Sequence, residues 1–364
     1  MIVSIHRVDP SGAISLMAAN VPYSNLQWTR RLSTCGEFAA ELACAFPGEW
    51  PGRYLLTSDE RDEVGVIEKV TASEDSSGNA CSISGRFAEC LWARWVAPAG
   101  GSTAKGANWR QAVTAALTNW HMSDIPALSM GSGTSSATGS SYSLVAEQGK
   151  SCMESVYAVT FDAGSRPLVS YDRDKDPGHL VVSLVDGVDR TRGQTANAVC
   201  VFALSLGTAD SMEYSGDYSS MCSEVLAHAS KNEGQSDEVS VSRTVGVPGF
   251  DAAAMWKARA FEDVSSLIDQ DAKPTAALVD SAGALRAYDH QAAVSIDGKI
   301  SCAGYLDTWD LGDLVEAELP SLSLVAEQRI EEVREVWKAE GHTVEATVGT
   351  KQLSRIARAL IGRR

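Results

Sequence analysis

The chain has 364 residues, of which 44% are hydrophobic and 21% charged, as is ordinary for a folded, soluble protein. Its formal net charge of −16 argues against a protein that binds the nucleic-acid backbone, because such binding needs a positive surface. No apolar run reaches the roughly 18 residues of a membrane helix, and residues 1–10 lack the pattern of a secretory signal. The length predicts two to four modules.

Eight cysteines are scattered along the chain, and no two of them form a C-x-x-C pair. This spacing argues against a zinc site and against a dense disulfide framework. We therefore expect buried, free thiols. The eight are Cys35, Cys44, Cys81, Cys90, Cys152, Cys200, Cys222 and Cys302.

The N-terminal part of the chain is predicted to consist of short strands with turns between them. Residues 26–32 alternate, which places Trp28 and Arg30 on one side of a strand. Residues 36–46 fit a helix, but their apolar positions also fit a period of two. A turn at residues 9–12, a hairpin at residues 58–63 and a strand pair at residues 64–71 and 80–84 complete the pattern. Such regular short strands predict a barrel rather than βαβ units.

Helices enter after a linker at residues 96–102. The first is expected over residues 107–121, and its apolar stripe consists of Trp109, Val113, Ala116, Leu117 and Trp120. A Gly/Ser-rich loop at residues 131–141, a second helix at residues 150–159 and a hairpin with arms at residues 168–171 and 180–185 follow. This part is predicted to be an α+β module.

Strand character returns after residue 191. Strands are expected at residues 198–206, 224–229, 256–263 and 294–300. Pro274 begins a helix that extends to Tyr288. The predicted inner face of this helix consists of Leu278, Val279, Ala282 and Leu285.

The last β-rich segment contains one ambiguous stretch. A strand at residues 314–319 follows a tight bend, and its Glu316 and Glu318 share one face. The composition of residues 325–338 favours a helix by propensity. The glycines around that stretch and the β-branched run at residues 343–348 favour a β-meander instead.

Alternate carboxylates at Asp172, Asp174 and Asp176 have the spacing that opens a calcium loop. Such a loop needs glycine at position six and a bidentate acid at position twelve, where this chain has Pro177 and Ser183. An acidic hairpin turn is the better interpretation. We assign no metal ligand.

No catalytic or cofactor-binding residue is assigned either. Ser132, between two glycines, lacks the strand-to-helix elbow of a hydrolase nucleophile, although a Ser-His-Asp site assembled in space stays open. Two acid pairs are candidates for a glycosidase site, namely Asp297 with Asp307 and Glu316 with Glu318. Acids alternate across several strands here, so solvated faces are the ordinary explanation.

The final segment, residues 351–364, carries five basic residues and no acid. Its apolar residues fall at helical spacing, which predicts an amphipathic helix with Ile356 and Leu360 buried against a neighbouring protein. Nucleic acid and a membrane surface are the alternatives. Without this segment the chain carries a charge of −21, that is −16 minus 5.

Short motifs follow one another in a fixed order along nearly the whole chain. They are Leu26-Gln27-Trp28-Thr29-Arg30-Arg31, Gly36-Glu37-Phe38, Gly65-Val66-Ile67-Glu68, Ser84-Gly85-Arg86, Leu91-Trp92-Ala93-Arg94, VDGVDRT at residues 185–191, Leu311-Gly312-Asp313 and RIxEV at residues 329–333. Their order resembles that of the tail-tip (baseplate) hub proteins of siphovirus-type tailed bacteriophages. The resemblance implies strands at residues 38–46 and 330–337 despite their helix-friendly composition. It also implies an architectural corner around Arg190.

The resemblance further implies a mainly β fold, with two tail-tube-type β-barrel domains and an α+β domain. The expected domains are residues 1–104 (first barrel), 105–197 (α+β), 198–250 with 292–350 (second barrel), 251–291 (small helical/β insertion) and 351–364 (basic segment). The same resemblance implies that the chain is a structural virion protein of the tail tip. It also implies that the protein is made in the host cytoplasm and is not an enzyme.

A hub of this kind is a homotrimer that ends the tail tube, adapts six-fold to three-fold symmetry and forms part of the DNA channel. Its implied partners are the distal tail ring protein, the tail tube and tape-measure proteins, and tip or receptor-binding proteins, with DNA only in transit and no stable membrane insertion. We expect acidic side chains to dominate the channel wall, with Glu316 or Glu318 among them.

Two alternatives stay open. One is a tail-associated hydrolase acting on peptidoglycan or glycan, for which residues 351–364 leave no room after the last strand. The other is a carbohydrate-binding β module, which the nine tryptophans favour.

Overall fold

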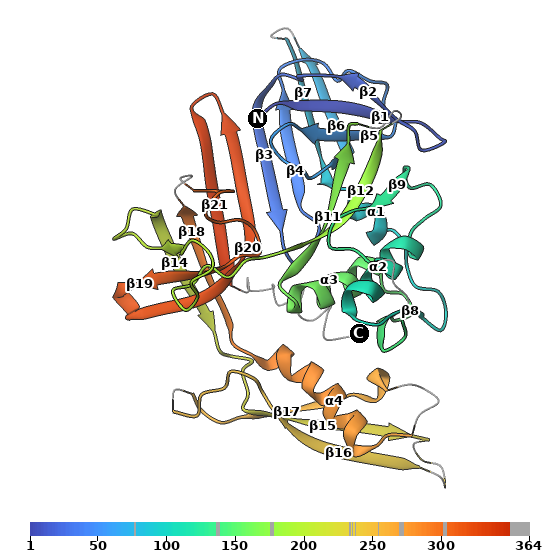
Figure 1. Ribbon diagram of the computed structural model, residues 1–364, viewed down its shortest axis with the longest axis vertical. Helices are drawn as coiled ribbons and strands as arrows, with labels where there is room; N and C mark the ends of the chain where they lie inside the picture. The colour runs from blue at the N-terminus through green and yellow to red at the C-terminus, as the bar shows by residue number, and fades with distance from the viewer. Residues whose placement is uncertain are drawn as a thin grey trace. The chain divides into compact units, whose positions relative to one another are not determined.

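The computed structural model describes residues 1–75, 78–135, 139–174, 178–232, 234, 236, 238–253, 255–268, 273–300 and 304–349. These residues belong to two compact units (Figure 1). The first unit comprises residues 1–213 with 296–349, and the second comprises residues 214–295. Strands account for 47% and helices for 14%, which confirms the mainly β class.

Seven strands form the N-terminal part of the first unit, in the sheet order β3-β4-β7-β6-β5-β1-β2. They are β1 (Val3–Val8), β2 (Ile14–Ala18), β3 (Tyr23–Arg31), β4 (Glu37–Leu42), β5 (Tyr54–Ser58), β6 (Gly65–Asp75) and β7 (Gly78–Phe87). One face of these strands shares a single core around Trp28 and Leu56, so the sheet curls around it. The predicted alternation is confirmed, because Trp28 and Arg30 are both buried.

Strand β4 confirms the strand predicted at residues 38–46 only as far as Leu42. Its ladder with β3 ends where Leu42 faces Tyr23. The next residue of the partner segment is Pro22, which has no N–H with which to continue the ladder. The Ala43 N–H still donates to the Pro22 carbonyl at 2.9 Å, but Pro22 cannot return a hydrogen bond and the ladder ends there.

An α+β part follows in the same unit. Its elements are α1 (Cys90–Ala93), β8 (Ser102–Gly106), α2 (Trp109–Asn119), β9 (Leu128–Met130), β10 (Tyr142–Ala146), α3 (Cys152–Asp162), β11 (Ser165–Asp172) and β12 (His179–Asp186). Helices α2 and α3 confirm the two predicted helices. Both begin at a capping side chain, since Asn108 accepts the N–H of Gln111 and Ser151 accepts that of Glu154. The predicted hairpin is the antiparallel pair β11–β12.

A second group of strands completes the first unit. Its elements are β13 (Val201–Phe202), β14 (Ala209–Asp217), β18 (Ala293–Ile300), β19 (Leu314–Leu319), the 3-10 turn η3 (Pro320–Leu322), β20 (Leu324–Lys338) and β21 (Gly341–Gly349). The strand predicted at residues 198–206 is wrong beyond its two central residues. The Thr208 hydroxyl donates to the Val201 carbonyl and accepts the Ala203 N–H, so the chain turns there. Strand β14 was not predicted.

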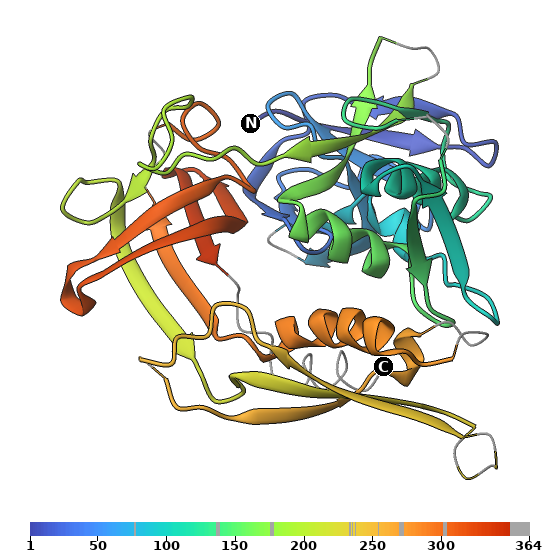
Figure 2. The same cartoon turned by 60° about the horizontal axis from the view of Figure 1, so that its bottom comes forward.

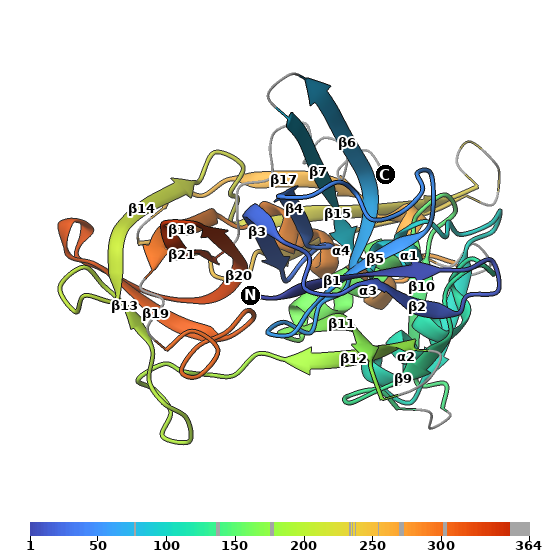
Figure 3. The ribbon, with the colours of Figure 1, turned by 90° about the horizontal axis from the view of Figure 1, so that it is seen from above.

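Strand β20 joins the two strand groups into one 13-stranded sheet (Figures 1 and 3). Its first six residues pair with β19. After an irregularity between Ile330 and Glu332 it pairs with β21 on one side and with β3 on the other. The predicted strand at residues 330–337 is therefore confirmed, since two ladders outweigh the helix propensity of the stretch.

The second unit is a three-stranded sheet with one helix on it (Figure 2). Its elements are β15 (Glu224–Lys231), β16 (Val239–Gly246), β17 (Arg259–Asp263), η1 (Ser265–Leu267), α4 (Ala276–Ala287) and η2 (Tyr288–His290). Strands β15 and β16 belong to this unit, whereas the predicted second barrel comprises residues 198–250 and 292–350.

The predicted inner face of α4 is half wrong. Val279 and Ala282 are buried, but Leu278 and Leu285 are 40% and 62% exposed. The helix meets the sheet through small residues: a Cβ added to Gly283 would lie 2.7 Å from the Cβ of Ala227. Close approach on the glycine side turns the two leucines toward solvent.

Candidate functional site

Charged side chains are buried beneath the pairing of β3 with β20. Arg30 of β3 and Glu335 of β20 are 4% and 0% exposed. The Arg30 Nε lies 2.7 Å from Oε1 of Glu63, and its Nη1 lies 2.5 Å from Oδ1 of Asp310. Arg61 donates to both carboxylate oxygens of Glu335. Each of these buried charges therefore meets an opposite charge, which burial requires.

Tyr305 connects the two ion pairs. Its hydroxyl accepts from Nη1 of Arg30 at 3.0 Å and donates to Oε1 of Glu335 at 2.9 Å. The Nε2 of His342 lies 3.1 Å from Oε2 of Glu335, and the His342 ring stacks on Trp337 with centroids 4.5 Å apart. Four segments that are distant in the sequence thus converge on one polar cluster.

Glu63 and Glu335 of this cluster stay ionised because their pKa values are lowered. Burial acts to raise the pKa of Glu63, but Arg30 and Arg166 outweigh it and lower the pKa to about 2. Burial likewise acts to raise the pKa of Glu335, and the hydrogen bonds from Arg61 and His342 lower it. Such carboxylates neutralise arginines and are poorly suited to proton transfer near neutral pH.

Glu89 differs from these carboxylates. Burial raises its pKa to about 7. Its Oε1 accepts the N–H of Val169 at 3.0 Å, while no hydrogen bond reaches Oε2 from the described residues. Arg166, whose charge acts to lower the pKa of Glu89, donates its hydrogen bond to Glu63. Burial thus keeps the pKa of Glu89 well above its usual range where the first strand group meets the α+β part.

Two of the sequence motifs meet at a tight corner. A Cβ on Gly187 would lie 1.8 Å from the carbonyl oxygen of Gly312, so the two backbones touch. Asp313 accepts the N–H of Val188 at 2.7 Å and the Arg190 Nε at 2.5 Å. The structured corner expected around Arg190 is present, and its role here is to join β12 to the second strand group.

Glu316 and Glu318 do share one face of β19, where both bind Arg192. Glu316 accepts the Arg192 backbone N–H at 2.6 Å and lies 3.1 Å from its Nη1. Glu318 lies 2.7 Å from Nη2. Glu316 is only 4% exposed, whereas the Glu318 side chain is 23% exposed, so Glu318 is the more accessible of the two candidates for a channel wall.

The remaining predicted residues are dispersed. Asp172 accepts the backbone N–H of Asp174 at 3.1 Å in the turn after β11, and Asp176 lies outside the described residues. Asp297 accepts the Thr347 hydroxyl at 2.5 Å, whereas Asp307 is exposed on a turn. Ser132 lies in a turn whose carbonyl accepts the N–H of Leu184.

Within the described part of the chain, no three potential ligand side chains are grouped closely enough to hold a metal ion. No helix in that part has the length and apolarity needed to cross a membrane. The seven described cysteines are free thiols, and Cys302 lies outside the described residues. The helix predicted at residues 351–364 also lies outside them.

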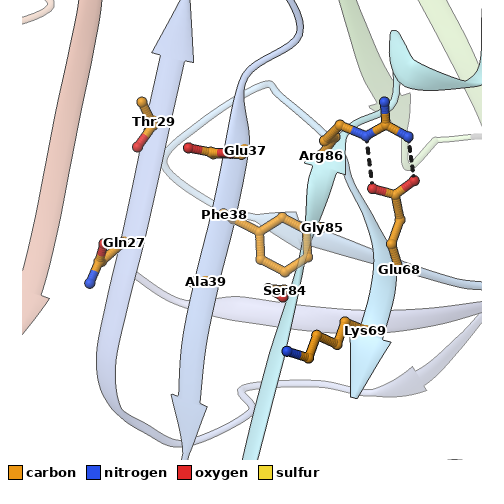
Figure 4. Close-up of a pocket in the computed structure, with 10 residues that line it drawn as sticks. All are labelled: Gln27, Thr29, Glu37, Phe38, Ala39, Glu68, Lys69, Ser84, Gly85 and Arg86. Carbon is orange, nitrogen blue, oxygen red and sulfur yellow. Dashed lines mark hydrogen bonds and ion pairs between the residues drawn. The ribbon is translucent and has the colours of Figure 1, made fainter. Parts of the chain in front are cut away.

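The solvent face of the first strand group carries a polar hollow of about 370 Å³ (Figure 4). Its floor is shallow because Ala39, Ser84 and Gly85 are small. At its rim Arg86 forms two hydrogen bonds with Glu68, of 2.9 and 2.7 Å. The other lining residues are Gln27, Thr29, Glu37, Phe38 and Lys69.

Arginines elsewhere on this face are also paired. Arg31 lies 2.6 Å from Glu37 and 2.7 Å from Glu332, and Arg334 lies 3.0 Å from Glu345. The arginines of this face are therefore locally neutralised, whereas Lys69 is exposed.

A family model described as Siphovirus ReqiPepy6 Gp37-like protein matches residues 11–350. The chain belongs to this family. No curated protein sequence matches it significantly. The resemblance to phage tail proteins is thus confirmed at the level of the siphovirus family.

Solved structures of phage tail proteins share the fold of this siphovirus protein. The 43 kDa tail protein of prophage MuSo2 from Shewanella oneidensis has a TM-score of 0.60 and 14% identity, covering 96% of this chain and 98% of that chain. The tail protein from Neisseria meningitidis MC58 has a TM-score of 0.58 and 14% identity, covering 98% of each chain. Prophage tail protein gp18 from Listeria monocytogenes EGD-e has a TM-score of 0.53 and 12% identity, covering 98% and 97%. At such identities the likeness establishes the fold alone.

The charged cluster of this family member was missed by sequence reasoning. A signal was nevertheless present, because Arg30 shares the buried side of its strand with Trp28. Glu335 likewise alternates with Val333 and Trp337 in β20. A charge in register with core residues indicates a buried ion pair, although its partner cannot be read from the alternation.

Gly187→Ala is expected to destabilise the first unit by more than about 2 kcal/mol, because the new Cβ would overlap a backbone oxygen that no side-chain rotation can move. Urea unfolding followed by tryptophan fluorescence measures this. The matched control is Gly246→Ala, where no atom lies within 4 Å of the added Cβ. Equal effects of the two substitutions would contradict the close contact.

Glu335→Gln is expected to cost about 3 kcal/mol of unfolding free energy, since it leaves Arg61 buried without its counter-charge. Glu345→Gln is the control, because its partner Arg334 is 41% exposed and such pairs contribute at most about 1 kcal/mol. The denaturant midpoints of both variants, compared with that of the native chain, measure the two losses of unfolding free energy. A loss at position 335 no larger than that at position 345 would refute the role of the cluster.

Glu89→Gln is expected to change the pH dependence of stability. The folded pKa of about 7 exceeds the unfolded value of 4.5, so stability falls as pH rises between them, by at most about 1.4 kcal/mol per pH unit. Gln does not titrate, and the variant should therefore exceed the native chain in stability near pH 8 and match it near pH 4. Unfolding curves between pH 4 and pH 8 measure the difference in stability between the variant and the native chain. A difference that does not change with pH would contradict the prediction.

Proposed function

We propose that this chain is a structural protein of the phage tail, a homotrimeric hub at the tail tip. It ends the tail tube and adapts six-fold to three-fold symmetry. The observation that carries the proposal is the single sheet that runs through both strand groups and ends at β14 and β2. End strands expose unpaired N–H and C=O groups, and pairing with neighbouring copies in a closed ring satisfies them. Two strand groups per chain would give three copies six wall segments.

The joint between the strand groups supports a wall of fixed curvature. The β3–β20 ladder extends from Glu332 opposite Arg31 to Lys338 opposite Asn25. Beneath it, Arg61 and Glu335 are bonded at two points. A backbone ladder above a neutralised core resists hinge motion, as a tube adapter requires.

The solvent face of this sheet is our candidate for the DNA channel wall. Its arginines at positions 31, 86 and 334 each have a carboxylate within hydrogen-bonding distance. A paired arginine attracts phosphate weakly, because little charge remains to displace counterions. DNA would therefore pass without being held. This neutralised wall takes the place of the acidic wall in which Glu316 was a candidate.

The same proposal gives the surroundings of the protein. It is made in the host cytoplasm, is incorporated at the tail tip of the virion and is not inserted stably in a membrane. Its partners are the distal tail ring, the tail tube and tape-measure proteins, and tip or receptor-binding proteins. It is not an enzyme. Glu316 and Glu318, the acid pair weighed for a hydrolase, are engaged by Arg192.

The mass of the purified full chain in native buffer tests the proposal. A hub should have three times the subunit mass of 38.6 kDa, and electron micrographs should show rings with a central channel. Closed symmetry predicts that this mass does not grow with concentration. A chain that stays monomeric at micromolar concentration would refute the hub.

A further inference from the structure

Among the described residues of the second unit, no helix or further strand packs on one face of the sheet. Helix α4 packs on the other face, where Ala227 and Ala229 form a core with Val279 and Ala282 (Figure 2). Arg243 of β16 also reaches the helix side, with its Nε 2.9 Å from Oδ1 of Asp280. No other described element of this unit packs on the opposite face.

Strand β16 presents a shelf of short polar side chains on that open face. Its residues alternate between valines toward the helix and small hydroxylated residues toward solvent. The exposed set is Ser240, Ser242, Thr244 and Gly246. A Cβ built on Gly246 meets nothing within 4 Å, so the shelf is open at that end.

Phe261 lies across the sheet from this shelf. It is 62% exposed, while its small neighbour Ala260 turns toward the core. The strand therefore places its largest apolar side chain in solvent, against the usual burial of Phe. Phe261 is in register with Leu226 of β15, which is in register with Thr244 of the shelf.

A second row of polar groups lies beside the aromatic ring. The His228 ring centroid is 6.0 Å from that of Phe261, and its Nδ1 is 2.9 Å from the Ser242 hydroxyl. Asp263 is in register with His228. The arginine of this face, Arg259, is already paired with Glu224 at 2.5 Å.

We propose that this face binds a neutral saccharide. A pyranose has an apolar C–H face that stacks on an aromatic ring, and hydroxyls that exchange hydrogen bonds with Ser, Thr, His and Asp side chains. Phe261 of β17, with His228 of β15 next to it, gives the stacking surface, and the shelf on β16 lies one strand further across the same open face. The proposal does not depend on the hub assignment.

Two other kinds of partner fit this face less well. A stable protein interface usually buries about 800 Å² on each side around several large anchors. Here Phe261 and Leu226 are the two large apolar side chains among the residues of β15, β16 and β17 on the open face. An anionic ligand would find Arg259 already neutralised by Glu224.

Saturation-transfer NMR on the full chain tests the proposal, with neutral oligosaccharides of glucose, galactose, N-acetylglucosamine and rhamnose as probes. At least one should bind in the millimolar range or tighter and receive saturation at its ring C–H protons. Phe261→Ala should weaken that binding about tenfold or more. The control is Leu285→Ala on α4, whose side chain is also 62% exposed and which should leave binding unchanged.

A second variant guards against an indirect effect of the first. Thr244→Arg occupies the shelf from an exposed position and should block binding while leaving the circular dichroism of the chain unchanged. The proposal is overturned if none of these sugars binds the native chain, or if binding survives both substitutions. Capture of a tail protein through Phe261 without sugar binding would overturn it as well. The hub assignment is measured separately, by native mass.

Discussion

The fold of the first unit depends on keeping charges neutral beneath the β3–β20 ladder. Arg30 and Glu335 are buried between the strand groups, where an unpaired charge costs several kcal/mol. Their partners Glu63, Arg61 and Asp310 come from two separate loops. Neither strand group can therefore form its final core alone, since each supplies counter-charges for the other. This mutual dependence makes the whole sheet one cooperative element.

A backbone constraint acts beside the electrostatic one. The chain leaves the α+β part at Gly187 and meets Gly312 at a distance that no side chain tolerates. Asp313 then accepts hydrogen bonds from the Val188 N–H and the Arg190 side chain. The corner fixes the entry of the chain into the second strand group, and so determines where β19 and β20 begin. Motifs more than a hundred residues apart are thus parts of one joint.

The second unit is built in the opposite manner. Its helix meets its sheet through small residues, as Gly283 against Ala227 shows, whereas Phe261 faces solvent. Large apolar side chains are ordinarily used for stability, and placing one outside gives up that contribution. The two units therefore divide the demands on a tail protein. In the functions proposed above, the first unit supplies a charge-paired wall and the second supplies a face that binds a saccharide.

Local patterns in the sequence determined the alternation of Trp28 and Arg30 in β3, the helix α2 and the tight bend before β19, because these depend on side chains a few residues apart. Tertiary structure alone decided the rest. Residues 330–337 have helical propensity and became a strand because two partner strands were available. The sequence pattern predicts a solvated acid at Glu316, whereas in the fold its carboxylate is buried and paired with Arg192. Spacing along the chain determines which face a residue is on, but only packing determines what that face meets.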